Sequence, residues 1–267
     1  MQELIKRNWI YIVWLSFYVI LFSVITNGIA LLFYIVSVPL AFSPIAESLW
    51  RKVSGIRPLR IRLEKDRLLP LFKEVYLETA KNNPNLSKAI NLYIQENMDI
   101  NAFAFGRRTL VITRGSIELL SDEGLKGLMA HELGHFANND TVMSLLAIIA
   151  NFPLSIIIKI AANFKDHFDK EAKGGIVMGA FKIIYDTIYY FFTGLKFIGD
   201  LILMRSSRQS EFSADNFAYE NGFGKDLTDV LIEIYKVSID KPKSVKEQLK
   251  STHPPITIRI ERLEKVI

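Results

Sequence analysis

Residues 8–46 contain no Asp, Glu, Lys or Arg, and this 39-residue stretch limits the possible folds more than any other feature of the sequence. As one helix it would reach roughly 58 Å, about twice the ~30 Å hydrocarbon core of a bilayer. The apolar region of a cleavable signal peptide is only ~7–15 residues long. The stretch therefore excludes an ordinary soluble globule and a disordered chain, and it argues against a cleavable signal peptide.

The uncharged stretch is interrupted near its middle by a turn signal at residues 26–28, Thr-Asn-Gly. Two helices, over about 9–25 and 29–48, would then form a hairpin. Lys and Arg residues flank both ends, as they do on the cytoplasmic side of membrane spans. We therefore predict that residues 1–50 form a transmembrane hairpin with both ends in the cytoplasm.

The net charge of +5 could reside entirely in residues 51–67, which carry seven basic residues against two acidic ones. Nucleic-acid binding would require basic residues interleaved with aromatic ones or placed on a reading helix, and this segment has neither. No nucleic-acid partner is expected, and the segment is interpreted as a cytoplasmic flank. The chain has no cysteine, so any metal must be held by His and carboxylate side chains.

The composition of residues 51–141 and 205–267 is that of one soluble domain in two pieces, predicted to be mainly α-helical with a small antiparallel β-sheet. We expect this domain on the cytosolic side. The strands expected are 90–96, 101–105 and 109–113, and the clearest helices are 68–83 and 121–138.

Residues 142–204, inserted in this domain, return to an apolar composition and are predicted to form a second helix pair. Four charged residues lie in its second half and can form two i,i+4 pairs, Lys182 with Asp186 and Lys196 with Asp200. Two membrane crossings are favoured. A pair that lies at the membrane interface, or packs on the soluble domain, stays an alternative.

The sequence His131-Glu132-Leu133-Gly134-His135 falls within the helix predicted over 121–138. A spacing of four places both imidazoles on one helix face, one turn apart. Two such nitrogens can hold a zinc ion, and Glu132 can act as a general base on a water molecule. With only four histidines in the chain, a chance occurrence has odds of roughly one in a few hundred.

A catalytic zinc site needs a third protein ligand and one open position. Glu211 is the stronger candidate, because Asp215 follows one helical turn later and could orient a ligating histidine. His167 is a weaker one, since it lies in a charged segment over 165–169 that reads as a solvated loop.

The sequence resembles the HtpX-type membrane zinc metalloproteases, relatives of the CaaX prenyl protease. Four motifs, in the order of that family and spread over nearly the whole chain, carry the resemblance: Asn101 to Ala104, His131 to Asp140, Ser207 to Asp215, and Thr252 to Pro255 with Arg259, Ile260 and Leu263. Three positions depart from the family's usual residues, Phe105, Ser210 and Phe212, and they bear on substrate preference.

The resemblance implies a polytopic membrane protein with a gluzincin-like metalloprotease domain that holds one Zn²⁺ per chain. The implied zinc ligands are His131, His135 and Glu211, with Glu132 as the catalytic base. Asp215 and Asp140 would orient the ligands, and the edge strand Asn101, Ala102, Phe103 and Ala104 would pair with the substrate backbone. His253 and Arg208 are candidates to stabilise the developing oxyanion, and a structural ion pair is the alternative for Arg208.

The implied function is that of a zinc endopeptidase in the plasma or inner membrane, with its active site facing the cytoplasm. Its substrates would be misfolded or damaged membrane proteins, a task of protein quality control and stress response. Two alternatives stay open: a CaaX-type processing protease with a narrow substrate, and a membrane adaptor that holds zinc without turnover.

Overall fold

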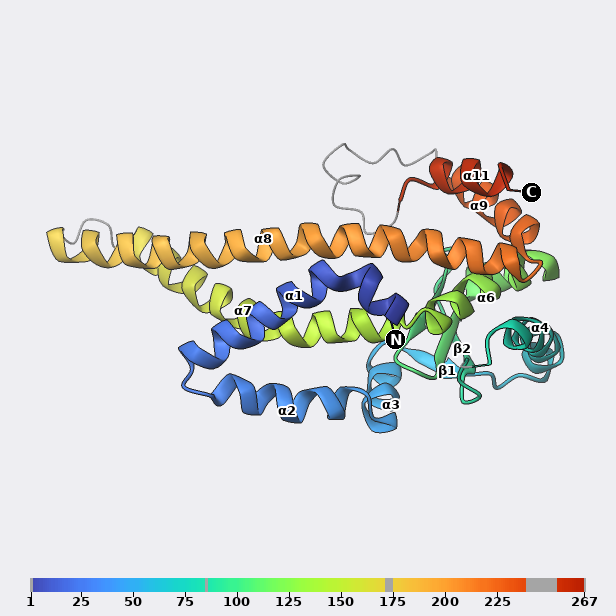
Figure 1. Cartoon of the computed structure of the whole chain (residues 1–267), viewed down its shortest axis with the longest axis horizontal. Coiled ribbons are helices and arrows are strands. Elements are labelled where there is room, and N and C mark those ends of the chain that lie inside the picture. Colours follow the sequence, from blue (N-terminus) through green and yellow to red (C-terminus); the bar gives the residue numbers. More distant parts are fainter. Residues whose placement is uncertain (1, 85, 171–174, 239–253, 267) are drawn as a thin grey trace. The chain divides into compact units, whose positions relative to one another are not determined.

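The computed structural model describes residues 2–84, 86–170, 175–238 and 254–266, which are mainly helical with one four-stranded sheet (Figure 1). The chain divides into two compact units. The helical unit comprises Met1–Pro39 and Leu146–Ser206, and the sheet unit comprises Leu40–Leu145 and Ser207–Ile267.

The helical unit contains α1 (Gln2–Ile25), most of α2 (Ile29–Ala41), and long parts of α7 (Asp140–Lys170) and α8 (Gly175–Glu220). The predicted turn joins α1 to α2, with Asn27 at φ 50° and Gly28 at φ 88°, a left-handed conformation that these two residue types tolerate. Tyr18 on α1 donates a hydrogen bond to the Leu195 carbonyl on α8, at 2.9 Å. Tyr34 on α2 donates one to Ala150 on α7, at 3.2 Å.

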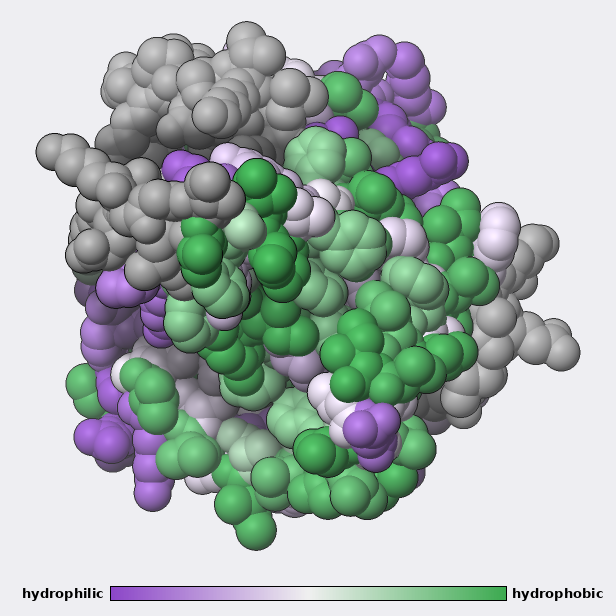
Figure 2. Space-filling view, turned by 90° about the vertical axis from the view of Figure 1, so that its left-hand side faces the viewer, coloured by the Kyte–Doolittle hydropathy of each residue, from purple (hydrophilic) through white to green (hydrophobic). Residues whose placement is uncertain are grey.

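Three described helices are long and apolar enough to cross a membrane: α1 over Asn8–Ile25, α7 over Asp140–His167 and α8 over Gly179–Glu220. A fourth span results if α2 and the short helix that follows it count as one bent span. Their large apolar side chains are exposed at many positions, and Figure 2 shows apolar residues over much of the face on which the α1–α2 turn lies. The prediction of a multi-pass membrane protein is confirmed.

The predicted second helix of the hairpin, over 29–48, is wrong at its end. It stops at Ala41, and a separate helix, α3 (Pro44–Val53), begins after a two-residue break, bent by 79°. Ser43 causes the break, because it caps α3 by accepting a hydrogen bond from the Ala46 N–H at 3.2 Å. Pro44 favours the first position of a helix and disfavours a helical conformation of the residue before it.

The sheet has the strand order β1-β2-β4-β3. Its strands are β1 (Ile56–Pro58), β2 (Asn91–Gln95), β3 (Ala102–Phe105) and β4 (Thr109–Thr113). The sheet is mixed and not antiparallel throughout, because β2 and β4 run parallel. The chain leaves β2, passes to the far edge as β3 and returns through a tight turn, so that β4 lies between them and runs in the direction of β2.

Helix α6 (Asp122–Ala137) begins where predicted, with the Ser121 hydroxyl accepting a hydrogen bond from the Gly124 N–H at 3.1 Å. Leu125, Met129 and Leu133, four residues apart, are fully buried on one of its faces. The helix packs against β3 and against helices before and after it in the chain. Those helices are α4 (Arg62–Asn82), which starts earlier than predicted, and α9 (Gly224–Ser238). Two shorter helices, α5 (Arg114–Leu119) and α11 (Ile256–Glu264), also belong to the sheet unit. Because α6 contacts strand and helices alike, residues on it are held from several sides.

A buried carboxylate joins α4 to the sheet. Glu64 is 5% exposed and accepts hydrogen bonds from Arg57 at 2.6 Å and from Arg114 at 2.7 Å. Both guanidinium groups also contact Glu96. The hydrogen bond from Arg57, despite the opposing effect of burial, holds the pKa of Glu64 well below its ordinary value.

We predict that Glu64→Gln lowers the free energy of unfolding by about 2–3 kcal/mol, because it removes hydrogen bonds between charged groups in a buried place. Thermal unfolding of the detergent-solubilised protein, followed by tryptophan fluorescence, measures this change. Asp66→Asn is the matched control, because Asp66 forms an exposed pair with Arg62 and should contribute less than about 1 kcal/mol. Equal melting temperatures for the two variants would contradict the prediction.

The same carboxylate predicts a pH dependence of stability. The pKa of Glu64 is lower in the folded than in the unfolded chain, where it has its ordinary value of 4.5. Its contribution to stability is therefore complete above pH 4.5 and is lost as the pH falls below that value. The melting temperature of the wild type should fall more steeply on acidification than that of Glu64→Gln, and parallel curves would contradict this.

Candidate active site

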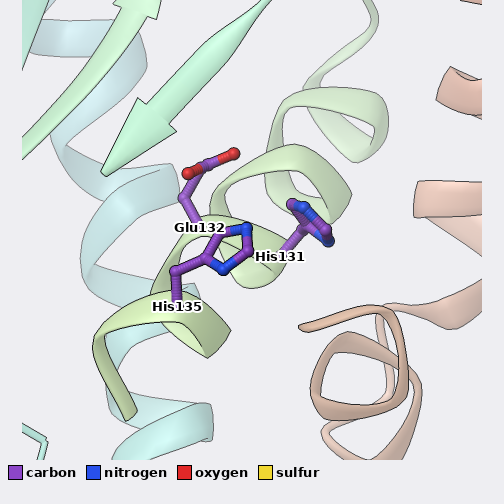
Figure 3. Close-up of side chains that lie close together, drawn as sticks. All are labelled: His131, Glu132 and His135. Atoms are coloured by element: carbon purple, nitrogen blue, oxygen red, sulfur yellow. The ribbon is translucent and has the colours of Figure 1, made fainter. Parts of the chain in front are cut away.

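Helix α6 places three chemically active side chains together (Figure 3). Ligand atoms of His131, Glu132 and His135 all lie within 4.8 Å of one another. The two imidazole rings are 4.8 Å apart between centroids and meet edge to face at 84°. His131 and Glu132 are buried, and His135 is partly exposed. The spacing of four residues between the two histidines thus brings their imidazoles together, as expected from the sequence.

Glu211 on α8 reaches the same place. One of its carboxylate oxygens lies 3.6 Å from Nε2 of His131, and the other lies 3.8 Å from Nε2 of His135. The absence of a side chain at Gly134 permits this approach of α8 to α6, since a Cβ there would lie 3.0 Å from the Cα of Ala214. The structure therefore brings the two histidines and the predicted third ligand together.

The other nitrogen of each histidine has a carboxylate partner. Nδ1 of His131 lies 3.0 Å from Asp215, and Nδ1 of His135 lies 3.0 Å from Asp140. Asp140 in turn accepts a hydrogen bond from the Ser210 hydroxyl at 3.1 Å. A carboxylate at Nδ1 keeps the proton on that nitrogen and leaves the Nε2 lone pair directed at a metal.

Arg259 on α11 is the site residue to which sequence reasoning gave no role. Its guanidinium donates hydrogen bonds to both oxygens of Asp215, at 2.9 and 2.6 Å, and lies 3.1 Å from Glu211. The sequence held one signal for it. Arg259 shares the face of α11 that carries Ile260 and Leu263, and a charge on the buried face of an amphipathic helix indicates a buried partner.

These contacts determine how the site takes up protons. Burial alone lowers the pKa of His131, but its hydrogen bonds to Asp215 and Glu211 raise that pKa to about 10. Burial raises the pKa of Asp215, and the hydrogen bonds from His131 and Arg259 lower it below its ordinary value. A metal ion at Nε2 of His131 would therefore compete with a proton for that nitrogen.

The donor set fits a divalent metal. Bonds of about 2.0–2.1 Å to a tetrahedral ion separate neighbouring ligand atoms by roughly 3.3–3.4 Å. The distances from Glu211 to the two Nε2 atoms, 3.6 and 3.8 Å, are within a few tenths of an ångström of that value. Glu132 lies in the same group, but Glu211 is the carboxylate that directs one oxygen at each imidazole.

The remaining predicted site residues are placed as follows. Ala102, Phe103 and Ala104 lie in β3, the edge strand that packs against α6, and Asn101 directly precedes it. Arg208 lies one turn before Glu211 on α8, and within the described residues its buried Nε has no hydrogen-bond partner. His253 lies outside the described residues.

His167 is not part of the sheet unit. The prediction of a loop over 165–169 is wrong, because these residues continue helix α7. His167 is exposed there and belongs to the helical unit, whereas the two histidines of α6 belong to the sheet unit.

Comparison with known proteins gives consistent results. Peptidase family M48 matches residues 72–267. A protein named Protease HtpX homolog from Bacillus subtilis is 29% identical over 252 residues, which cover 84% of this chain and 80% of that protein. A protein of the same name from Bacillus pumilus is 31% identical over 248 residues, with the same two coverages.

The crystal structure of Ste24p from S. mikatae has a similar fold, with a TM-score of 0.54 and 17% sequence identity. The similar region covers 96% of this chain and 66% of Ste24p, so this chain spans about two thirds of the length of that protein. The family match covers most of the chain and includes all the clustered side chains described above. The chain therefore belongs to peptidase family M48 and is a membrane metalloprotease of the HtpX type.

Proposed function

We propose that this metalloprotease is a zinc endopeptidase that cleaves cytosolic segments of misfolded or damaged membrane proteins. One observation carries the proposal. The Glu211 carboxylate lies near the Nε2 atoms of His131 and His135, beside Glu132. The helix that carries the two histidines and Glu132 packs against the edge strand of the sheet. A site of this kind has both the donors for a catalytic metal and a backbone edge on which a peptide can lie.

His131, His135 and Glu211 would hold the zinc ion. Two imidazoles and one carboxylate are a common set for catalytic zinc, and they leave a position open for water or substrate. A bound zinc ion polarises a peptide carbonyl and lowers the pKa of water near it. Asp215 and Asp140 keep the two imidazoles in the orientation and tautomer that the ion requires.

Glu132 would move the proton. The Glu132 residue is 5% exposed, and its carboxylate lies among the ligand atoms. From there it can reach a water molecule that attacks the substrate carbonyl. It accepts the proton of that water and then donates it to the nitrogen of the departing amine. Arg208 and His253 are proposed to stabilise the negative charge that develops on the carbonyl oxygen.

The strand β3 would hold the substrate. It is last in the strand order and, among the described strands, pairs only with β4. A peptide that adds to such an edge is recognised through its backbone, so it must be extended and can have many sequences. These requirements fit unfolded segments better than folded proteins, which supports a task in quality control.

The proposed location is the plasma or inner membrane, with the active site in the cytoplasm. The basic residues in the first turns of α1 and after the hairpin support this side of the membrane. Because α7 leaves the sheet unit and α8 returns to it, the segment between them would cross the membrane an even number of times. We therefore assign residues 1–50 and 142–204 to the membrane and the remainder to the cytosol.

We predict that Glu132→Gln reduces cleavage of an unfolded model protein by roughly 10²–10⁴-fold while leaving zinc bound, because it removes the base and no ligand. The measurement compares detergent-solubilised variants by gel and by zinc analysis. Glu123→Gln, at an exposed position on the same helix, is the control and should cut at the wild-type rate.

The outcome also separates the alternatives. Equal cleavage by wild type and Glu132→Gln would exclude Glu132 as the base. If neither protein cuts while both bind one zinc ion, broad quality control is excluded, and a narrow processing protease or a zinc-containing adaptor is favoured. A folded version of the same substrate should be cut far more slowly than the unfolded one.

We further predict that Asp140→Asn weakens zinc binding by roughly 10–100-fold, because the amide no longer fixes the His135 ring as a carboxylate does. Ser210→Ala should have a smaller effect in the same direction, since Asp140 keeps its contact with His135. Competition with a chelator measures the affinity, and Asp229→Asn, at an exposed position, is the control. An unchanged affinity of Asp140→Asn would contradict this role.

A further inference from the structure

Helix α3 is amphipathic, but its apolar face is exposed and its polar face is buried, which is the reverse of the arrangement on a soluble protein. Its apolar residues Ile45, Leu49 and Val53 recur every four positions and are 75%, 62% and 80% exposed. Soluble proteins rarely expose a continuous apolar stripe of this kind without a partner for it.

The polar face of α3 is the one that packs on the protein. Glu47 is 2% exposed and accepts hydrogen bonds from the Arg107 N–H at 2.8 Å and from the Thr109 hydroxyl at 3.0 Å. Trp50 stacks on Phe105 with ring centroids 3.7 Å apart. These contacts fix the rotation of the helix, so the apolar stripe cannot turn inward without breaking them.

Exposed cations accompany the stripe. Lys52 is exposed on α3 itself, and Arg60, Arg62 and Lys65 are exposed shortly after it in the chain. Ile61 and Leu63, between these cations, are 56% and 79% exposed. Apolar side chains mixed with Lys and Arg are typical of segments that lie on anionic membrane surfaces.

The geometry points to an anionic bilayer surface as the partner of α3, with Ile45, Leu49 and Val53 immersed at the level of the lipid headgroups. Chain continuity argues for lipid over a second protein. Only Phe42 and Ser43 separate α3 from α2, a candidate part of a membrane span, and two residues reach at most ~7 Å. α3 therefore begins close to this apolar segment, where lipid is the nearest apolar partner. Lys52, on the edge of the stripe, can extend its ammonium group to the phosphates.

Environment-sensitive fluorophores test this placement in the full chain. The protein has no cysteine, so Leu49→Cys provides a single labelling site. Leu77→Cys, at a 53% exposed position on α4, is the matched control. Both are made in the Glu132→Gln variant, and the readout requires no proteolysis, so the result is independent of the proposed function. The protein is reconstituted, one copy per disc, in nanodiscs of phosphatidylcholine with phosphatidylglycerol.

We expect brominated lipid to quench the label at position 49 several-fold more strongly than the label at position 77, with the reverse order for aqueous iodide. Lys52→Glu should reduce the lipid quenching at position 49 in discs that contain phosphatidylglycerol, and Lys73→Glu, an exposed charge change on α4, should not. Equal lipid quenching at the two positions would overturn the proposal. A label at position 49 that neither lipid nor iodide quenches would also overturn it and would indicate a protein partner.

Discussion

The geometry of the candidate metal site depends on two hydrogen bonds, from His131 to Asp215 and from His135 to Asp140. They leave both Nε2 atoms facing Glu211, which comes from a helix far along the chain. The arrangement gathers several carboxylates in a buried place, where their mutual repulsion would be severe in the absence of cations. Arg259 explains how this is tolerated, because its buried guanidinium lies between Asp215 and Glu211 and contacts both.

What could be predicted from the sequence was mostly local. The paired histidines and the cap at Ser121 depend on helical periodicity and on one hydrogen bond near the start of the helix, and both are visible in a few consecutive residues. The parallel pairing of β2 with β4 depends on the path of the chain between them, which strand propensity does not contain. The contact of Arg259 with Asp215 joins residues 44 positions apart, and only the packed structure creates it. The break at Ser43 was visible as a Ser-Pro pair, but the uniform apolar composition around it concealed its meaning.

The basic segment over 51–67 has two roles that composition alone cannot separate. Arg51 binds the Thr109 hydroxyl at 2.8 Å, and Arg57 binds Glu64. Arg67 donates to Asp122 and to the Ile117 carbonyl. Arg51 and Arg57 join α3 and α4 to the sheet, and Arg67 joins α4 to α5 and α6, whereas other cations of the same segment remain exposed. A count of charges near a membrane span therefore overstates the number that serve orientation alone.

The buried Glu47 joins α3 to the turn that follows β3, and Trp50 adds a second contact at the end of that strand. These contacts hold α3 to the end of the edge strand. If α3 rests on the bilayer as proposed, the strand would stand at a fixed height above the lipid. Peptide bonds within a narrow band of heights would then be presented to Glu132, whatever their sequence. Under the proposed function, the selection of a cleavage site would then depend on how far an unfolded segment emerges from the lipid surface, more than on its side chains.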